Sequence, residues 1–230
     1  MLQKTQGISL YFLKYKESSI IAKIYTEQFG LQSYLINGVR KEKAIFKVSL
    51  FQPLTILEMV VYHKENKDSL QRISEVRCAE PYQNIPYDMF KTNTAFFMAE
   101  VLSKTLQGER ENTQIFSFLL NYLRGLDTED FHSNFPIYFL LNLIEKLGLL
   151  GDNCEVILQT LHDLHILKQK PSSMQKEIAI LNELKSSMYG SFHLPTAQRR
   201  QLLDMVLAYY RIHFEGLGEL KSLQVLRSLV

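Results

Sequence analysis

A dense group of cationic side chains lies in one short stretch of the 230-residue sequence, residues 39–47. The stretch reads VRKEKAIFK, so one aromatic side chain, Phe46, stands among four cations. Cations neutralise phosphates and exposed rings stack on bases, which makes this combination typical of a surface for single-stranded nucleic acid. We therefore expect nucleic-acid contacts from Arg40, Lys41, Lys43 and Lys47.

A charge run taken alone is more often a solvated loop, and Phe46 is as compatible with a core position as with stacking on a base. The interpretation as a binding loop depends on a nucleic-acid-binding barrel around it. Three further cations lie in the segments before the loop and would extend the same surface: Lys14, Lys16 and Lys23.

One grouping has the residue types of a metal site, namely Cys154 with His162 and His165. Two histidines three residues apart on a helix can point the same way, and a thiolate can join them. A fourth ligand is lacking nearby, although structural zinc sites take four. We expect no metal and no other cofactor.

The motifs of common catalytic sites are absent from the sequence. It contains no GxxxxGK[ST] phosphate loop, no GxGxxG after a strand, no HExxH and no GxSxG. Gly216 and Gly218 form a lone GxG in a helical segment, which is more typical of a kink or a helix end. We expect that the protein is not an enzyme.

The segments around the basic loop are rich in β-branched and aromatic residues that alternate with a period of two, which predicts half-buried strands. Residues 27–30 between the second and third segments read as a tight hairpin. Five short strands with one longer basic connection after the third suit a small closed barrel of the OB type, and an SH3-like barrel fits almost as well. The expected strands cover residues 7–15, 19–26, 31–37, 54–62 and 70–76.

Two prolines in residues 80–86 interrupt regular structure, and after them the apolar residues follow helical spacing. Asp88 and Asn112 are expected to cap the first two helices. Pro136 suits the first turn of a third helix, and Gly148 suits its C-terminal end.

Helical periodicity returns in residues 174–188 and 196–214, whereas residues 151–173 show no clear pattern. We expect an α+β chain of two domains. An OB-type barrel would occupy residues 1–80, and an all-α domain would occupy residues 81–230.

Charge is uneven although the net charge is only +2. Residues 1–80 contain twelve Lys and Arg against eight Asp and Glu, whereas residues 81–230 contain fourteen against sixteen. Cys78 and Cys154 are too few for a disulfide framework, which fits a reducing compartment. No apolar segment approaches the roughly 20 residues of a membrane helix, and the charges around residues 8–13 exclude a signal peptide. We expect a cytoplasmic protein that does not cross a membrane.

A series of short motifs in a specific order runs from end to end of the chain. They are KTQGI (4–8), KYKESS (14–19), IYTEQFGL (24–31), NGVR (37–40), LFQPL (50–54), PY with IP (81–86), AEVL (99–102), YYRIH (209–213) and LKSLQVL (220–226). In these motifs the chain resembles the bacterial RecO family of DNA repair proteins, in the form found in Bacteroidetes-like members.

The resemblance implies a recombination mediator of the RecF pathway with an OB domain and a helical domain. Such a protein binds single- and double-stranded DNA, anneals complementary strands and acts with RecR. It also binds the acidic C-terminal tail of single-stranded DNA-binding protein and so helps RecA to load on coated strands. Many members carry a four-cysteine zinc module, but residues 151–191 here contain only Cys154, which again argues against a metal.

An acidic, aromatic tail requires an apolar pocket flanked by cations. The segment 199–221 combines cations with an apolar stripe of helical spacing, although such a stripe more often packs in a core. Its cations must reach water or an anion, because burying an unpaired charge is costly. We expect the tail to contact Arg199, Arg200, Arg211 and Lys221.

Two alternatives remain open at the level of sequence. One is an RNA-binding OB protein, because the barrel itself does not distinguish the two sugars. The other is a non-catalytic protein-interaction scaffold whose basic loop is merely solvated.

Overall fold

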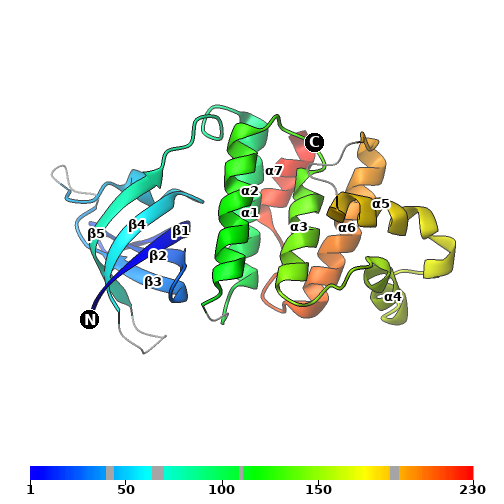
Figure 1. Cartoon of the computed structure of the whole chain (residues 1–230), viewed down its shortest axis with the longest axis horizontal. Helices are drawn as coiled ribbons and strands as arrows, with labels where there is room; N and C mark the ends of the chain where they lie inside the picture. The colour runs from blue at the N-terminus through cyan, green and yellow to red at the C-terminus, as the bar shows by residue number, and fades with distance from the viewer. Residues whose placement is uncertain (40–43, 64–69, 109–110, 187–191, 230) are drawn as a thin grey trace. The chain divides into compact units, whose positions relative to one another are not determined.

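The computed structural model describes residues 1–39, 44–63, 70–108, 111–186 and 192–229. The chain divides into two compact units, Met1–Thr128 and Glu129–Val230, which we call the barrel unit and the helical unit. All β-strands precede the α-helices, so the chain has the predicted α+β class (Figure 1). The domain boundary expected after residue 80 marks the change from strands to helices and stays a prediction, because the barrel unit also includes the first two helices.

Five strands form a closed barrel in the order β1-β2-β3-β5-β4. The pairing of β3 with β5 is parallel, and the other four pairings are antiparallel. A five-stranded barrel with this strand order is of the OB type, as the sequence predicts. The elements are β1 (Leu2–Tyr15), β2 (Ser19–Thr26), β3 (Gly30–Ile36), the 3₁₀ helix η1 (Val48–Phe51), β4 (Ile56–Tyr62) and β5 (Gln71–Glu80).

The interior of the barrel is filled by every second side chain of its strands, as the strand period requires. Ser9 is a buried polar residue among them, and its hydroxyl donates a hydrogen bond of 3.0 Å to the carbonyl of Phe51, which ties η1 to β1. Gly7 leaves room for two core side chains, because a Cβ atom there would lie 2.7 Å from both Ile24 and Met59. The buried core consists of Ile20, Ala22, Ile24, Tyr34, Ile36, Val39, Phe51, Leu57, Met59 and Val61.

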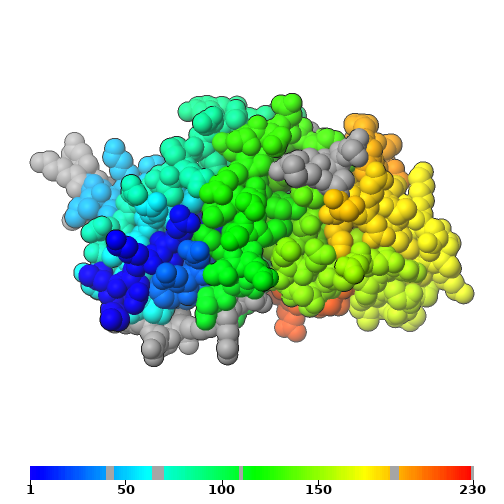
Figure 2. Space-filling model, in the orientation of Figure 1, coloured from blue at the N-terminus to red at the C-terminus, as the bar shows by residue number. Residues whose placement is uncertain are grey.

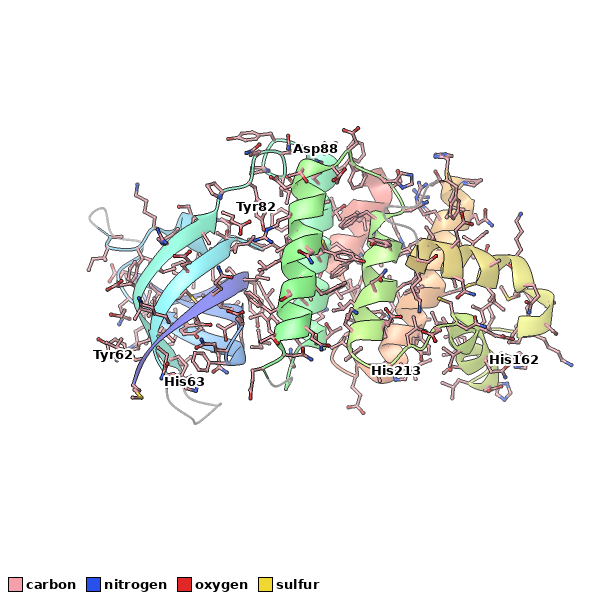
Figure 3. All side chains as sticks on the ribbon, in the orientation of Figure 1. Tyr62, His63, Tyr82, Asp88, His162 and His213 are labelled. Carbon is pink, nitrogen blue, oxygen red and sulfur yellow. The ribbon has the colours of Figure 1, made fainter. Side chains whose placement is uncertain are left out.

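Two helices, α1 (Met89–Thr105) and α2 (Thr113–Thr128), complete the barrel unit, and α1 packs against β1. The predicted caps are confirmed. The Asp88 carboxylate accepts the N–H groups of Phe90 and Lys91 at the start of α1 (Figure 3), and Asn112 does the same for α2.

The linker between barrel and helices is fastened at both ends. The hydroxyl of Tyr82 donates to the carbonyl of Leu54 at 2.6 Å. The buried carboxylate of Asp127, near the end of α2, accepts backbone N–H groups at 2.8 to 2.9 Å from Gln83, Asn84 and Ile85. This segment is therefore an ordered part of the barrel unit.

The helical unit is built around α3, which packs against α5 and α6, while α4 packs against α6. The predicted apolar stripe of α6 is core, since Leu203, Val206, Leu207 and Tyr210 are buried. Gly148 has the positive φ of 75° expected after α3. The elements are α3 (Phe135–Lys146), α4 (Glu155–Asp163), η2 (Pro171–Ser173), α5 (Gln175–Ser186), α6 (Thr196–His213) and α7 (Lys221–Leu229). Within the described ranges, no helix has the length and apolar character needed to cross a membrane.

Candidate functional site

The outward side of β1, β2 and β3 carries two rows of side chains. Residues opposite each other in paired strands point to the same side of a sheet. The register places Tyr11 opposite Lys23, and Lys23 opposite Ser33. In the next row, Leu13, Ile21 and Leu35 are opposite one another, with Arg72 of β5 beside Leu35.

On the same side of the sheet, the next pair of residues toward the β2–β3 turn is covered by a helix. Ile8 and Tyr25 are opposite each other and fully buried, and the ring of Tyr25 lies 6.2 Å from that of Phe116 in α2. The helices of the barrel unit therefore cover one end of this side and leave the other rows open. We call the uncovered part the open face, made of Tyr11, Leu13, Tyr15, Ile21, Lys23, Ser33, Leu35 and Arg72.

The open face is apolar, aromatic and basic at once. Leu13 is 59% exposed and Tyr15 is 37% exposed. Lys23, opposite Tyr11 and diagonal to Leu13, is half-buried, and this burial lowers the pKa of its ammonium group. In the space-filling view, the dark-blue residues of the first strand lie together with lighter-blue residues on the surface of the barrel (Figure 2).

The other two sequence-predicted cations of β1 and its turn, Lys14 and Lys16, do not lie on the open face. Lys14 is exposed but lies opposite Ile20, so it points to the side away from Lys23. Lys16 occupies the β1–β2 turn with a φ of 52°, and its Nζ lies 5.5 Å from the ring centroid of Tyr15.

The basic loop is described only in part. Arg40, Lys41 and Lys43 lie outside the described residues. Lys47 is exposed and immediately precedes η1. Phe46 is partly buried and packs against the barrel core, so the core interpretation of this ring is the one that the structure supports.

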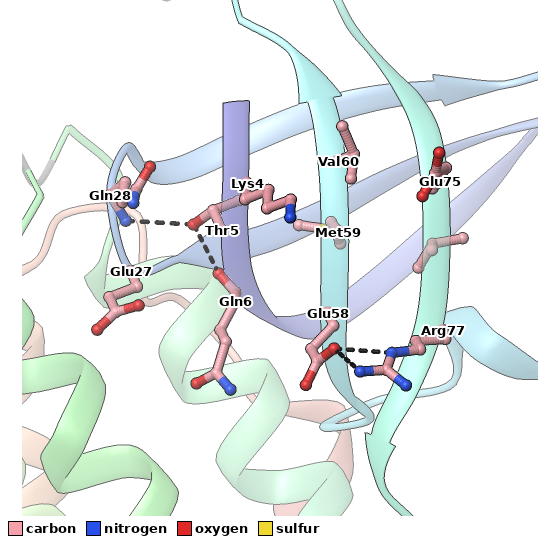
Figure 4. Close-up of a pocket in the computed structure, with 11 residues that line it drawn as sticks. Lys4, Thr5, Gln6, Glu27, Gln28, Glu58, Met59, Val60, Glu75 and Arg77 are labelled. Carbon is pink, nitrogen blue, oxygen red and sulfur yellow. Dashed lines mark hydrogen bonds and ion pairs between the residues drawn. The ribbon is translucent and has the colours of Figure 1, made fainter. Parts of the chain in front are cut away.

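A hollow of about 590 Å³ lies elsewhere on the barrel, over β1, β4, β5 and the β2–β3 turn (Figure 4). Glu58 and Arg77 form an ion pair there, and the Nε of Arg77 donates to Glu58 at 2.7 Å. With Glu27 and Glu75, the carboxylates outnumber the cations Lys4 and Arg77. Phosphates would be repelled rather than attracted by this balance, so the hollow is not part of the candidate nucleic-acid surface.

The helical unit contains a small apolar pocket rimmed by arginines. Its volume of about 20 Å³ is close to the space that one water molecule needs. The start of α3, the first turns of α6 and the end of α7 form its walls. It is lined by Ser133, Pro136, Ile137, Leu203 and Leu226, with Arg199, Arg200 and Arg227. We call it the arginine pocket.

The sequence-predicted cations relate to this pocket in different ways. Arg199 is only 6% exposed, and its guanidinium donates to the carbonyl of Leu194 at 2.9 Å and to the hydroxyl of Thr196 at 3.2 Å. Burial and then Arg200 lower the pKa of Arg199. Its charge is thus satisfied inside the protein, which sequence reasoning did not foresee.

Arg200 is exposed on the same helix, and its Nη2 donates to the carbonyl of Arg227 at 2.6 Å. Arg211 and Lys221 are exposed too, but neither lines the arginine pocket. Arg227 was missed because it lies outside the segment 199–221, although the amphipathic pattern of residues 221–229 would have placed it on a helix.

The residues of the suspected metal site do not form one. Cys154 is fully buried at the start of α4, where its backbone N–H donates to Asn182 at 2.7 Å. Burial raises the pKa of its thiol to about 11, so the metal-binding thiolate is disfavoured. His162 lies on α4 (Figure 3), and His165 follows that helix. In the part of the chain that the structure describes, no three His, Cys, Asp or Glu side chains gather as a metal site would require.

Comparison with known proteins gives a consistent answer for the whole chain. Residues 1–82 match the family model described as "Recombination protein O N terminal", and residues 86–152 match "Recombination protein O C terminal". The chain is 35% identical to the DNA repair protein RecO of Bacteroides fragilis, in an alignment that covers 100% of this chain and 99% of that protein. It is 32% identical to RecO of Flavobacterium psychrophilum over 98% of each chain. With RecO of Chlorobium limicola the identity is 29%, over 96% of this chain and 81% of the other.

Proposed function

The chain belongs to the RecO family of DNA repair proteins, and on that premise we propose that it is a recombination mediator that binds single- and double-stranded DNA and anneals complementary strands. The observation that carries the proposal is the open face. Exposed Leu13 and Tyr15 share one side of an OB-type barrel with Lys23 and Arg72, and this fold commonly binds strands on this part of its surface.

The chemistry of the open face suits single strands without sequence preference. Aromatic side chains such as Tyr11 and Tyr15 offer stacking platforms that accept any base. Lys23 and Arg72 supply charges for the phosphates between the bases. A phosphate beside Lys23 would also favour the charged form of an ammonium group whose pKa burial has lowered.

We place the remaining cations around this face. Arg40, Lys41, Lys43 and Lys47 would extend the phosphate track from the connection after β3, and Lys16 would extend it from the β1–β2 turn. Lys14 points to the other side of the sheet and would add only longer-range attraction. Because these contacts reach phosphates and not base edges, they would serve annealing, in which the protein must hold any sequence and release the paired product.

Loading of RecA on coated strands requires contact with the protein that coats them. We assign this contact, with the acidic tail of single-stranded DNA-binding protein, to the arginine pocket. Its apolar walls would contact an apolar or aromatic terminal side chain once the pocket has widened, and its arginines suit carboxylates. Arg200 would contact the tail directly, and Arg211 and Lys221 would add longer-range attraction. Arg199 would shape the wall, because that side chain is buried and internally bonded. RecR remains a proposed partner without an assigned surface.

Annealing kinetics test both parts of the proposal. Complementary labelled strands would be mixed bare, coated with single-stranded DNA-binding protein, or coated with the same protein lacking its last few residues. We expect the chain to accelerate annealing of bare strands, and of coated strands only when the tails are intact. Lys23→Ala should slow both reactions, whereas Arg200→Ala should slow only the reaction on coated strands. No acceleration of bare strands would overturn the annealing function, and tail-independent acceleration would overturn the tail assignment.

A further inference from the structure

The cations of the arginine pocket are engaged by groups of the chain itself. The Nη2 of Arg227 forms an ion pair with the carboxylate of Asp204, which lies on α6. The Nη2 of Arg200 donates to the main-chain carbonyl of Arg227 at 2.6 Å. The end of α7 is thus held onto α6 by contacts that an incoming carboxylate would have to replace.

The pairing of Arg227 is incomplete. Arginine can bind a carboxylate through two parallel N–H groups, and such bidentate pairs are among the strongest hydrogen-bonded contacts in proteins. Asp204 is bonded to Nη2, while the Nε of Arg227 is buried and has no hydrogen-bond partner among the described residues. A carboxylate that approached the edge formed by Nε and Nη2 would satisfy both donors.

The Asp204–Arg227 pair is also easy to open. The side chain of Arg227 is 40% exposed and that of Asp204 is 55% exposed. Exposed ion pairs contribute little to stability, because water competes for both charges. Asp204 returns to water when it is displaced, so the exchange leaves no buried charge without a partner.

The small size of the pocket also indicates that α7 must move before a peptide side chain can enter. With about 20 Å³ between its walls, it has no room for an aromatic ring. Leu226 of α7 is one of those walls and Arg227 follows it in the chain, so releasing Arg227 from Asp204 loosens the wall that must move. The described arrangement is therefore the closed one.

We propose that Asp204 is a built-in competitor that occupies Arg227 until a peptide carboxylate displaces it, and that Arg227 is the main carboxylate-binding residue of the arginine pocket. This inference rests on the proposed function of that pocket. Asp204 would then determine how many carboxylates a peptide needs in order to bind to the pocket. Peptides with several carboxylates would compete well, and apolar peptides without them would not.

The test uses the full chain and a fluorescent peptide with the last residues of single-stranded DNA-binding protein, with binding followed by anisotropy at fixed salt. Asp204→Asn removes the competitor and should raise the affinity for the peptide about two- to fivefold, which corresponds to the free energy of an exposed ion pair. Arg227→Gln should lower it about tenfold or more, because a charge-assisted bond is lost. In the Arg227→Gln background, Asp204→Asn should have no further effect, because its action passes through Arg227.

Glu183→Gln is the matched control, since it removes one exposed carboxylate from α5 of the same unit. It should leave the peptide affinity nearly unchanged. Thermal unfolding would establish that each variant is folded. An equal gain from Glu183→Gln, or a gain from Asp204→Asn that survives without Arg227, would overturn the competitor role and leave the pocket function standing. A wild-type chain that does not bind the peptide at all would overturn both.

Discussion

Tyr11 and Lys23 are opposite each other on β1 and β2, and both are half-buried on the open face. A ring held by its neighbours loses little freedom when a base stacks on it, and a lysine beside it meets the phosphate of the same nucleotide. We therefore propose this pair, rather than the exposed Lys14, as the main nucleic-acid contact of the open face.

Replacing Tyr11 by Ala should therefore weaken binding to single-stranded DNA. Loss of one stacking platform costs about 1–3 kcal/mol, which corresponds to a loss of affinity of roughly 5- to 150-fold. Tyr87→Ala is the control, because Tyr87 is an exposed tyrosine in the segment before α1, outside the open face. Anisotropy titrations with labelled oligonucleotides measure both. Equal losses for the two variants would show that no specific face binds the strand.

Asp127 is a second residue whose role can be isolated. Burial raises the pKa of its carboxyl, but the three backbone N–H groups of Gln83, Ile85 and Asn84, together with Lys91, outweigh that effect and lower it. Because the folded-state pKa lies below the unfolded value, the ionised carboxylate stabilises the protein fully above that value. The contribution is lost as the pH falls through the folded-state pKa.

Asp127→Asn should lower the free energy of unfolding of the barrel unit by about 1.5–3 kcal/mol at pH 7, the range for hydrogen bonds to a charged group. The difference from the wild type should shrink below about pH 4, near the unfolded pKa of aspartate. Urea unfolding at a series of pH values measures it. If the difference in the free energy of unfolding stays constant down to pH 3, the charge of Asp127 does not stabilise the linker.

At the scale of elements, local signals predicted well what local chemistry determines. The N-caps Asp88 and Asn112, Pro136 at the start of α3 and the turn at Gly30 follow from hydrogen bonding and φ preferences of single residues. Long-range pairing was less accessible. β1 begins at Leu2 rather than Gly7 because residues 2–8 pair with β4, whose residues 56–62 are far away in the chain.

The candidate site was predictable to a similar degree. Its charged residue types were visible in the sequence, but the sides to which Lys14 and Lys23 point depend on the β1–β2 register and on an irregularity between Ser9 and Tyr11. The buried state of Arg199 depends on the carbonyl of Leu194, whose position is fixed only by the packed helical unit. Arg227 enters the pocket only because α7 folds back onto α6.

The packing of the barrel can be tested at Gly7, where β1 pairs with β2 on one side and with β4 on the other. Gly7→Ala would bring a Cβ to 2.7 Å from Ile24 and Met59, closer than packed carbon atoms allow. Overpacking of this kind costs about 1–3 kcal/mol. Gly216→Ala is the control, because nothing lies within 4 Å of a Cβ at that position. Amide hydrogen exchange of the barrel strands should be faster in Gly7→Ala alone, and unchanged protection would contradict this packing.

At the scale of the whole molecule, the uneven distribution of charge along the sequence fits the two proposed ligands. The surplus of cations belongs to the part of the chain that forms the barrel, whereas residues 81–230 are slightly acidic and place three of their six arginines at one pocket. A strand of DNA and an acidic peptide would thus be attracted to different surfaces of one chain. Such separation allows both to be bound together, as loading of RecA on a coated strand would require.

The salt dependence of binding to single-stranded DNA tests the central claim, that the basic surface of the barrel holds the strand, most directly. If the loop cations neutralise about four phosphates, the logarithm of affinity should fall with the logarithm of salt concentration at a slope of roughly −3, at about −0.7 per phosphate. Replacing Arg40, Lys41 and Lys43 by Ala should flatten that slope by about two units and weaken all sequences alike. The matched replacement of Lys168, Lys170 and Lys176, exposed cations of the helical unit, should leave it unchanged. A slope that is the same in wild type and in the loop variant would contradict the account and leave the loop as a solvated surface.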